Sequence, residues 1–326
     1  MKRRALLLAG SLSALGVRAQ QPQRERRIAA LLGYSADDPV AQNRFAAFRE
    51  RLAELGWEEP RNLKMDVRWS EGDVKRASDL AKELVALRPD AILCTTTPVT
   101  AALLRETRTI PIVFTVVSDP VGSGFVQNLS RPGGNATGLV NIEASLAEKW
   151  VQLLGELAPR VKRVAVMFNP NTAPYAEYYL PRLNAAAAAL GMTTFMATVQ
   201  KEGDIAEAVT MLGHDRGAGL IVMVDSFMYV HRKFLVAATA RRKVPAVYFT
   251  SEIAMEGGLI SYGVDVLELF RRAAPYVDRI LRGAKPAELP VEQPKTFELF
   301  INAKTAKALG LTIPQPMLLR ASQVIE

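Results

Sequence analysis

Two parts of the chain repeat the same order of features, and this repetition limits the possible folds more than any other property. A basic pair, an apolar strand, a polar loop, an amphipathic helix and a Leu-Gly pair follow one another in residues 26–56 and again in residues 162–191. The spacing is also similar, because Gly56 follows Arg27 by 29 positions and Gly191 follows Arg163 by 28. The repeated unit is therefore a strand followed by a helix.

A second pair of similar segments follows these units. Residues 91–119 and 219–252 each contain an apolar strand, a loop of hydroxyl or acidic residues, a helix, a proline and a further apolar strand, with Pro111 matching Pro245. Alternating strands and helices predict parallel sheets flanked by helices, a pattern that by itself gives any α/β chain some internal similarity. Because the landmarks keep their order in both halves, we favour an α/β fold of two Rossmann-like lobes.

The loops that follow the predicted strands are candidates for a ligand site, because open parallel sheets bind ligands beyond the carboxyl ends of their strands. Two such edges that face each other would form a cleft. In the first lobe the residues at these ends are Tyr34, Ser35, Thr95, Thr96, Thr97, Ser118 and Asp119. In the second lobe they are Asn169, Thr172, Tyr175, Asp225, Ser226, Phe227, Ser251 and Glu252.

The chemistry of these loops suits a small zwitterion. Thr95, Thr96 and Thr97 precede a predicted helix, where backbone N–H groups favour an anion and the hydroxyls can hold a carboxylate or cap the helix. Asp225 follows an apolar strand of the second lobe, so it would face an ammonium group or cap the next helix. The aromatic residues on or near the loops, which favour an apolar or aromatic ligand body, are Tyr34, Tyr175, Phe227 and Tyr229.

Sequence patterns of enzymes, nucleotide sites and metal sites are missing. The chain has no G-x-x-x-x-G-K-[ST] segment, no G-x-G-x-x-G after a strand and no G-x-S-x-G nucleophile turn. Neither His214 nor His231 has a metal-ligating partner four residues away, and the single cysteine, Cys94, ends an apolar run. The sequence therefore predicts a binding protein with no catalytic residues, no metal and no cofactor.

The N-terminus has the composition of a secretory signal. Residues 1–19 contain a basic start, about a dozen apolar residues and a Val-x-Ala site before polar residues. The apolar stretch is shorter than the about 20 residues that span a bilayer. Cleavage near Ala19 predicts a periplasmic protein, exported by the general or the twin-arginine route. The signal carries four basic residues and no acidic ones, so its removal lowers the net charge from +8 to +4. That charge gives weak support for nucleic-acid binding.

Three long segments carry a family resemblance. They are SDPVGSGFVQNLSRPGGNATGL, GGLISYGVDVLELFRRAAPYVDRILRGAKPAELPVEQP and FELFINAKTAKALGLTIPQPMLLRASQVIE, and the similarity covers almost the whole chain. They resemble the ABC-transporter substrate-binding proteins of the tryptophan-binding (TrpX-like) group. The resemblance implies the type I periplasmic binding fold, in which three crossing segments join two lobes and the ligand lies between them.

The resemblance also implies a division of the chain. The segment ATGLVN, residues 261–264 and residues 289–295 would be the three crossings. The expected parts are a signal in 1–19, a first lobe in 20–140 and 264–290, and a second lobe in 141–263 and 291–326.

The function expected from this resemblance is capture of a small carboxylate ligand, an amino acid or an aromatic acid, and its delivery to an ABC permease with its ATPase. We expect a monomer with no membrane-spanning segment and no nucleic-acid partner. The main alternative is a periplasmic ligand-sensing module for a chemoreceptor or a histidine kinase. A repressor core of similar fold would need an N-terminal DNA-binding helix pair, and the signal occupies that place.

Overall fold

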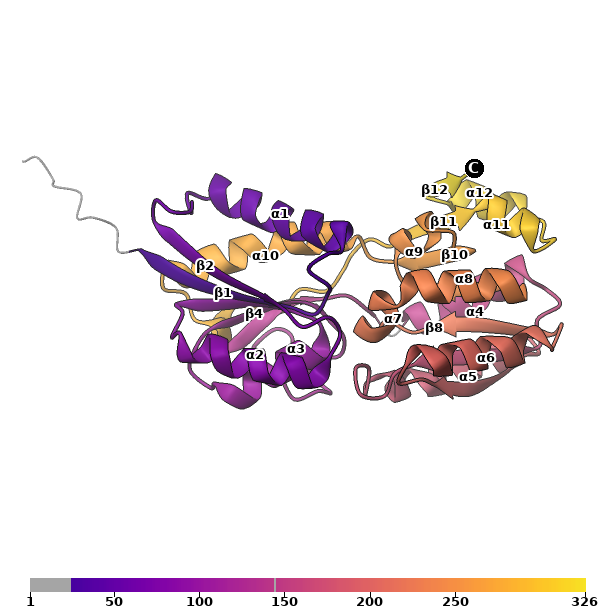
Figure 1. Ribbon diagram of the computed structural model, residues 1–326, viewed down its shortest axis with the longest axis horizontal. Coiled ribbons are helices and arrows are strands. Elements are labelled where there is room, and N and C mark those ends of the chain that lie inside the picture. The colour runs from indigo at the N-terminus through magenta and orange to yellow at the C-terminus, as the bar shows by residue number, and fades with distance from the viewer. Residues whose placement is uncertain (1–24, 144) are drawn as a thin grey trace, which may run out of the picture.

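The computed structural model describes residues 25–143 and 145–326, which form two α/β lobes side by side (Figure 1). The indigo and purple N-terminal part forms the first lobe, and most of the later chain forms the second. The exception is the orange helix α10 (Val266–Leu281), which returns to the first lobe. The predicted signal in residues 1–19 lies outside the described residues. Two lobes, each with a largely parallel sheet, confirm the predicted fold class.

The first lobe contains a five-stranded sheet in the order β2-β1-β3-β4-β5, in which every neighbouring pair is parallel. Both faces are buried, because Ile28, Ala30 and Leu32 of β1 pack in one hydrophobic cluster and Ala29 and Leu31 pack in another. Burial on both faces explains why these strands read as continuous apolar runs. The strands are β1 (Arg26–Leu32), β2 (Leu63–Trp69), β3 (Ala91–Thr95), β4 (Ile112–Val117) and β5 (Ala136–Val140).

Four helices cover this sheet. Helices α1 and α10 pack together on one face, and α2 and α3 pack on the other (Figure 1). Phe45 and Phe48 of α1 belong to the first cluster, and Ala81 and Leu84 of α2 belong to the second. The bounds are α1 (Pro39–Glu54), α2 (Val74–Ala86) and α3 (Thr97–Glu106), with a short 3₁₀ helix η1 (Pro286–Glu288) after α10.

The second lobe contains a seven-stranded sheet in the order β7-β6-β8-β9-β10-β11-β12, and only β10 and β11 are antiparallel. The strands are β6 (Arg163–Phe168), β7 (Thr193–Thr198), β8 (Ala218–Val222), β9 (Ala246–Tyr248), β10 (Ile260–Gly263), β11 (Glu298–Asn302) and β12 (Gln323–Ile325).

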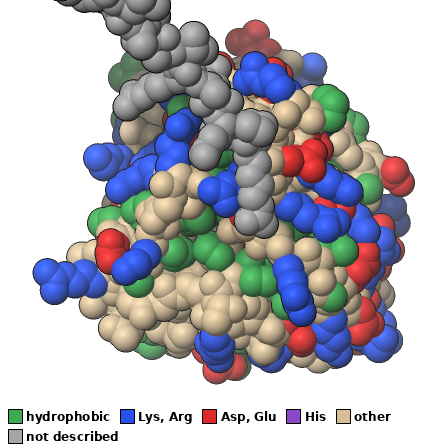
Figure 2. Space-filling view, turned by 90° about the vertical axis from the view of Figure 1, so that its left-hand side faces the viewer, with side chains coloured by type: hydrophobic (Ala, Val, Ile, Leu, Met, Phe, Trp, Pro, Cys, Tyr) green, Lys and Arg blue, Asp and Glu red, His purple; other side chains and the backbone are tan. Residues whose placement is uncertain are grey.

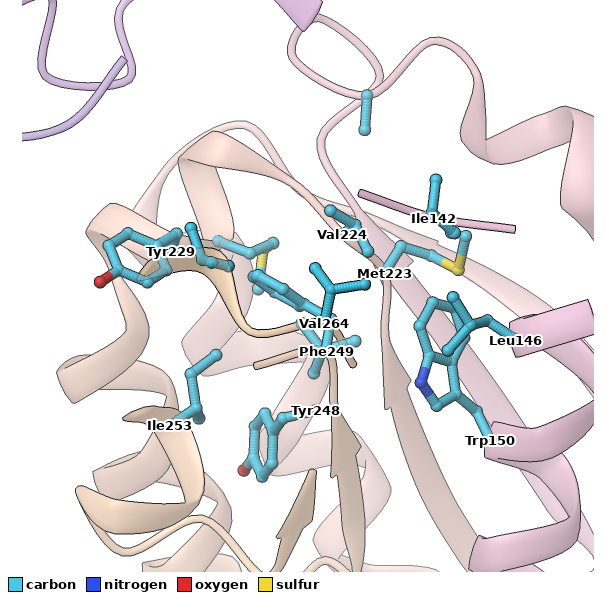
Figure 3. Close-up of a cluster of buried hydrophobic side chains, with 14 of the residues drawn as sticks. Ile142, Leu146, Trp150, Met223, Val224, Tyr229, Tyr248, Phe249, Ile253 and Val264 are labelled. Carbon is cyan, nitrogen blue, oxygen red and sulfur yellow. The ribbon is translucent and has the colours of Figure 1, made fainter. Parts of the chain in front are cut away.

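Helices on both faces of this sheet enclose the core of the second lobe. Trp150 is fully buried, and its Nε1 donates to the Tyr262 carbonyl oxygen at 2.8 Å. Figure 3 shows Trp150 and Leu146 beside Met223, and all three belong to this core. The helices are α4 (Ser145–Leu157), α5 (Ala176–Ala189), α6 (Glu202–Gly213), α7 (Ser226–Val230), α8 (Arg232–Arg242), α9 (Ser251–Met255), α11 (Ala303–Ala308) and α12 (Gln315–Arg320).

The chain passes between the lobes three times, after β5, after β10 and between η1 and β11. The first and third crossings lie side by side: the Val140 amide donates to the Glu292 carbonyl at 3.0 Å, and the Glu292 amide donates to the Gly138 carbonyl at 2.9 Å. The segment ATGLV, expected as part of the first crossing, is strand β5 itself, because it pairs with β4. The crossing therefore begins after Val140.

Charged side chains are dispersed over the end of the first lobe shown in Figure 2, with Lys and Arg scattered among Asp and Glu. Some charges of this lobe pair locally, as Arg76 does with Glu71 at 3.0 Å and Lys75 with Asp79 at 3.2 Å.

Within residues 25–143 and 145–326, no helix is both long enough and apolar enough to cross a membrane.

Gly138 should tolerate no side chain, because a Cβ there would lie 1.9 Å from the Phe114 carbonyl oxygen and its φ is +152°. We expect Gly138→Ala to lower the free energy of unfolding by at least about 2 kcal/mol, as overpacking at a strained position does. Gly134→Ala is the matched control, since a Cβ there meets nothing within 4 Å. Equal denaturation midpoints for the two variants would contradict this account.

Candidate ligand site

A pocket lies between the lobes, beyond the carboxyl ends of strands from both sheets. The space inside it, with open solvent at its mouth included, is about 490 Å³. Because both lobes line it, the pocket is complete only while the lobes are together. The lining residues are Tyr34, Arg44, Thr96, Thr97, Pro98, Val116, Asn141, Tyr175, Val224, Asp225, Ser226, Tyr229, Phe249, Thr250, Val264 and Val266.

The pocket has an apolar side formed by the edge of the second lobe's core. Val224, Phe249 and Val264 lie close together there, with the Tyr229 ring to one side (Figure 3). All four belong to the buried core. Such a surface suits an aromatic or aliphatic ligand body, because it removes apolar area from water without leaving a polar group unpaired.

Four polar atoms of the lining are buried without a hydrogen-bond partner among the described residues. They are Arg44 Nε and Thr96 Oγ1 of the first lobe and Ser226 Oγ and Tyr229 Oη of the second. Buried polar groups nearly always have partners, since an unpaired one costs about 1–3 kcal/mol. Their presence in one pocket indicates a ligand with polar groups that reach both lobes.

Thr96 occupies an unusual backbone conformation at the start of α3. Its φ is +71°, and the neighbouring lining residue Val116 has a φ of +58°. Positive φ values in two β-branched residues are true outliers, and such strain gathers at functional sites. Gly33 leaves room for this arrangement, because a Cβ there would lie 2.5 Å from Thr96 Oγ1. No side chain caps α3, so the backbone N–H groups of Thr97 and Val99 are available to an anion, whereas Pro98 between them has none.

The structure brings together six of the residues that the sequence proposed for the site. Thr96 and Thr97 of the first lobe face the same pocket as Asp225 and Ser226 of the second, as expected from the strand-end rule. The Thr97 hydroxyl already has one hydrogen-bond partner, because its Oγ1 accepts from the Ser118 amide at 3.1 Å. The six proposed residues that line the pocket are Tyr34, Thr96, Thr97, Tyr175, Asp225 and Ser226.

Asp225 caps α7, the alternative role that the sequence left open. Its carboxylate accepts from the Phe227 amide at 2.8 Å, from the Asn169 amide at 2.7 Å and from Thr172 Oγ1 at 2.5 Å. Burial raises the pKa of Asp225 to about 6, although these hydrogen bonds favour the ionised form. Capping does not exclude a ligand ammonium, because a carboxylate has about four acceptor sites.

Four other proposed residues lie behind the lining and hold it in place. Thr95 Oγ1 accepts from the Gly33 amide at 2.8 Å, and Ser118 Oγ donates to Asn141 Oδ1 at 2.9 Å. The remaining two, Asn169 and Thr172, support Asp225 as described.

The last five proposed residues do not line the pocket, because their side chains are engaged or lie elsewhere. Glu252 pairs with Arg44 at 2.5 Å. Asp119 accepts from the Gly122 amide at 2.8 Å and lines a neighbouring cavity. The Phe227 ring packs on the His231 ring at 4.3 Å between centroids. Ser35, in a loop, and Ser251, the first residue of α9, are partly exposed.

The strand-end rule missed much of the apolar lining and the only arginine of the pocket. Arg44 lies inside α1, and no local pattern distinguishes it from the other basic residues of that helix. Phe249 and Thr250 directly precede the proposed Ser251 and Glu252, so the rule placed this loop two residues too late. Asn141 follows the edge strand β5, which had been interpreted as a crossing. Among the described residues, no group of three His, Cys, Asp or Glu side chains has a metal-binding arrangement.

Comparison with known proteins decides the family. The model of a family described as ABC transporter substrate binding protein matches residues 36–325. This chain belongs to that family. The match confirms the resemblance found in the sequence, and it assigns the chain to proteins that bind and deliver solutes. Members of such a family act outside the cytoplasmic membrane.

Solved structures with the same fold accompany the family match. A Streptococcus pneumoniae ABC domain in complex with L-Trp is 28% identical, with a TM-score of 0.85, over 92% of this chain and 100% of that one. A conserved domain protein from Vibrio cholerae is 30% identical, with the same TM-score and coverage. A relative found by sequence, a tyrosine-binding protein of Clostridioides difficile, is 24% identical over 81% of this substrate-binding protein and 75% of its own length.

The raised pKa of Asp225 predicts a pH effect on stability. The folded-state pKa of Asp225 is above its unfolded value, so the folded protein takes up a proton as the pH falls from 7 to 5. The folded state is therefore stabilised relative to the unfolded state over this interval. Wild type should therefore gain about 1 kcal/mol relative to Asp225→Asn over this interval. Urea denaturation of both proteins at the two pH values measures the difference. A constant difference would show that Asp225 is ionised throughout.

Proposed function

We propose that this substrate-binding protein captures an aromatic amino acid in the pocket between its lobes and delivers it to an ABC permease. The observation that carries the proposal is the pocket itself, in which unpartnered polar atoms of both lobes surround an apolar side. The L-Trp complex and the tyrosine-binding protein among its relatives support the same ligand class. The protein releases its ligand unchanged, because its role is transport and not catalysis.

The polar groups suggest how such a ligand lies. Its carboxylate is held by Thr96 Oγ1, Ser226 Oγ and the first N–H groups of α3, and its ammonium group faces Asp225. The ring lies against Val224, Phe249 and the Tyr229 ring.

Capture follows from the division of the pocket between the lobes. A ligand that contacts both lobes binds the closed state more tightly than the open state, so it shifts the population toward closure. We propose that the protein does this as a periplasmic monomer, after export and cleavage near Ala19.

A thermal-shift screen tests the ligand class. L-tryptophan, L-tyrosine and L-phenylalanine should raise the melting temperature, because they bind only the native state. Tryptamine lacks the carboxylate and indole-3-propionate lacks the ammonium group, so both should give much smaller shifts. Stabilisation by sugars alone would contradict the proposal, and equal shifts from all the indole compounds would contradict the zwitterion arrangement.

Thr96→Val tests the proposed carboxylate contact. The substitution keeps the shape but removes a hydroxyl that has no partner, so the ligand-free melting temperature should not fall. Affinity for L-tryptophan should fall by about tenfold or more, as for loss of a charge-assisted hydrogen bond. Thr115→Val is the matched control, because Thr115 Oγ1 is also buried and unpartnered but lies outside the pocket. Equal affinities of the two variants for L-tryptophan, measured by calorimetry, would show that Thr96 does not contact the ligand.

A further inference from the structure

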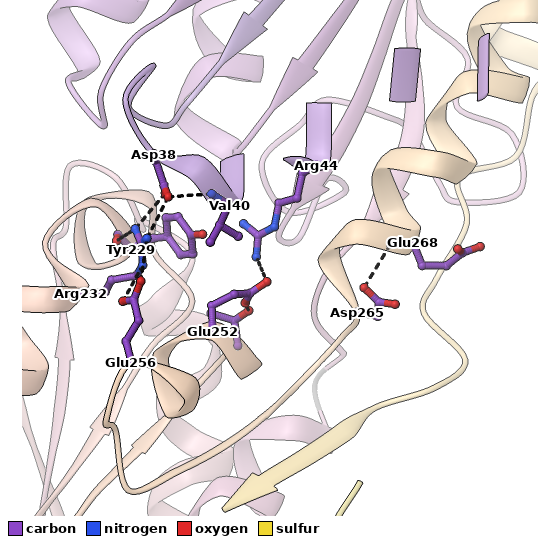
Figure 4. Close-up of polar contacts among 10 residues, drawn as sticks. Asp38, Val40, Arg44, Tyr229, Arg232, Glu252, Glu256, Asp265 and Glu268 are labelled. Carbon is purple, nitrogen blue, oxygen red and sulfur yellow. Dashed lines mark hydrogen bonds and ion pairs between the residues drawn. The ribbon is translucent and has the colours of Figure 1, made fainter. Parts of the chain in front are cut away.

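Charged residues of the two lobes form a buried group beside the pocket, which we call the interlobe ion cluster. Its members are Asp38 and Arg44 of the first lobe and Arg232, Glu252 and Glu256 of the second (Figure 4). Asp38 caps α1 and Arg44 lies within it, whereas the second-lobe members lie at the start of α8 and in or just after α9.

Arg232 lies between two carboxylates of different lobes. One terminal nitrogen donates to Glu256 Oε1 at 3.0 Å, and the Nε lies 3.0 Å from Glu256 Oε2 without forming a hydrogen bond. The two terminal nitrogens donate to the two Asp38 oxygens, at 2.9 and 3.0 Å. Such two-pronged pairing fixes the plane of a guanidinium group. Because Glu256 belongs to the same lobe as Arg232, it can hold the guanidinium in position while the lobes are apart, ready for Asp38.

Arg44 makes the second connection between the lobes. It is 1% exposed, and its terminal nitrogen binds Glu252 at 2.5 Å. Burial raises the pKa of Glu252, but Arg44 and the Thr250 hydroxyl outweigh it, so this pKa lies below its usual value. Glu252 is therefore held as a carboxylate, and the pair is ionic.

The cluster is joined to the pocket through two tyrosines. The Arg44 guanidinium lies 5.0 Å from the centre of the Tyr229 ring, and that of Arg232 lies 4.3 Å from it, both within cation–π range. Tyr229 in turn contacts Tyr34 of the first lobe edge-to-face, at 5.2 Å between centroids. Since Tyr34, Arg44 and Tyr229 all line the pocket, the ion pairs position part of its wall.

We propose that the interlobe ion cluster is a latch that holds the lobes closed on a bound ligand and sets the rate of its release. The side chains of Asp38 and Arg232 are 7% and 5% exposed, and they come from different lobes, so separation of the lobes breaks this pair and returns Asp38 to water. Removal of Asp38 takes the first-lobe partner from Arg232, and removal of Glu252 leaves the buried Arg44 without a carboxylate partner, in the closed state only. The latch therefore acts on closure and not on the folding of either lobe.

Asp38→Asn tests the latch on the L-tryptophan complex of the proposed function. Asparagine also caps helices well, so α1 should keep its start. Stopped-flow measurements should show the dissociation rate constant rising at least about tenfold, with a much smaller change in association, as for a broken charge pair. Glu252→Gln, which breaks the other connection, should also speed dissociation.

Asp66→Asn is the matched control, because Asp66 pairs with Arg27 at 2.7 Å within the first lobe. It should leave the dissociation rate unchanged. Unchanged dissociation in both Asp38→Asn and Glu252→Gln would overturn the latch, as would an equal increase in Asp66→Asn.

Failure of the proposed function can be told from failure of the latch. If wild type does not bind L-tryptophan, the ligand class is wrong, and the latch is then judged by small-angle scattering of the ligand-free proteins. A larger radius of gyration for Asp38→Asn than for wild type and Asp66→Asn would support it. Equal radii would overturn it.

Discussion

The division of one binding site between two lobes is the constraint on which the rest of this structure depends. The carboxyl ends of two sheets meet across the pocket, so polar atoms of both lobes, such as Thr96 Oγ1 and Ser226 Oγ, are buried in it. Closure without a ligand leaves these atoms unpaired, whereas closure on the proposed ligand would satisfy them. The energetic difference between these two closed forms allows a small solute to control the position of a whole lobe.

The ion pairs beside the pocket also depend on how the two lobes meet. Arg44 and Arg232 are almost fully buried, and each finds a carboxylate on the opposite lobe. Ions so placed fit only one closed arrangement, because any shift between the lobes would leave a charge unpaired at a cost of several kcal/mol. The apolar side of the pocket has no such directional preference, so the ion pairs and the ligand's polar groups together define how the lobes meet.

The repeats and the strand-end rule predicted the fold and the place of the site, but only part of its surface. Thr96, Thr97 and Asp225 directly follow strands, so local sequence was enough to bring them to the pocket edge. Arg44 lies within α1 and Val266 is the first residue of α10, and only the packing of these two helices places them at the pocket. Glu252 was proposed for the rim, but it pairs with Arg44, 208 residues away, and no local pattern encodes that pairing.

The distance between the lobes in solution tests the central claim most directly. Cys94 is buried, so cysteines introduced at the exposed positions Lys75 of the first lobe and Met211 of the second can carry spin labels selectively. Double electron–electron resonance should show a broad distribution without ligand, from the distance of the closed structure to longer ones, and a narrow one at the closed distance with L-tryptophan. Identical distributions in both conditions, for a protein that binds the amino acid, would contradict a site that ligand closes.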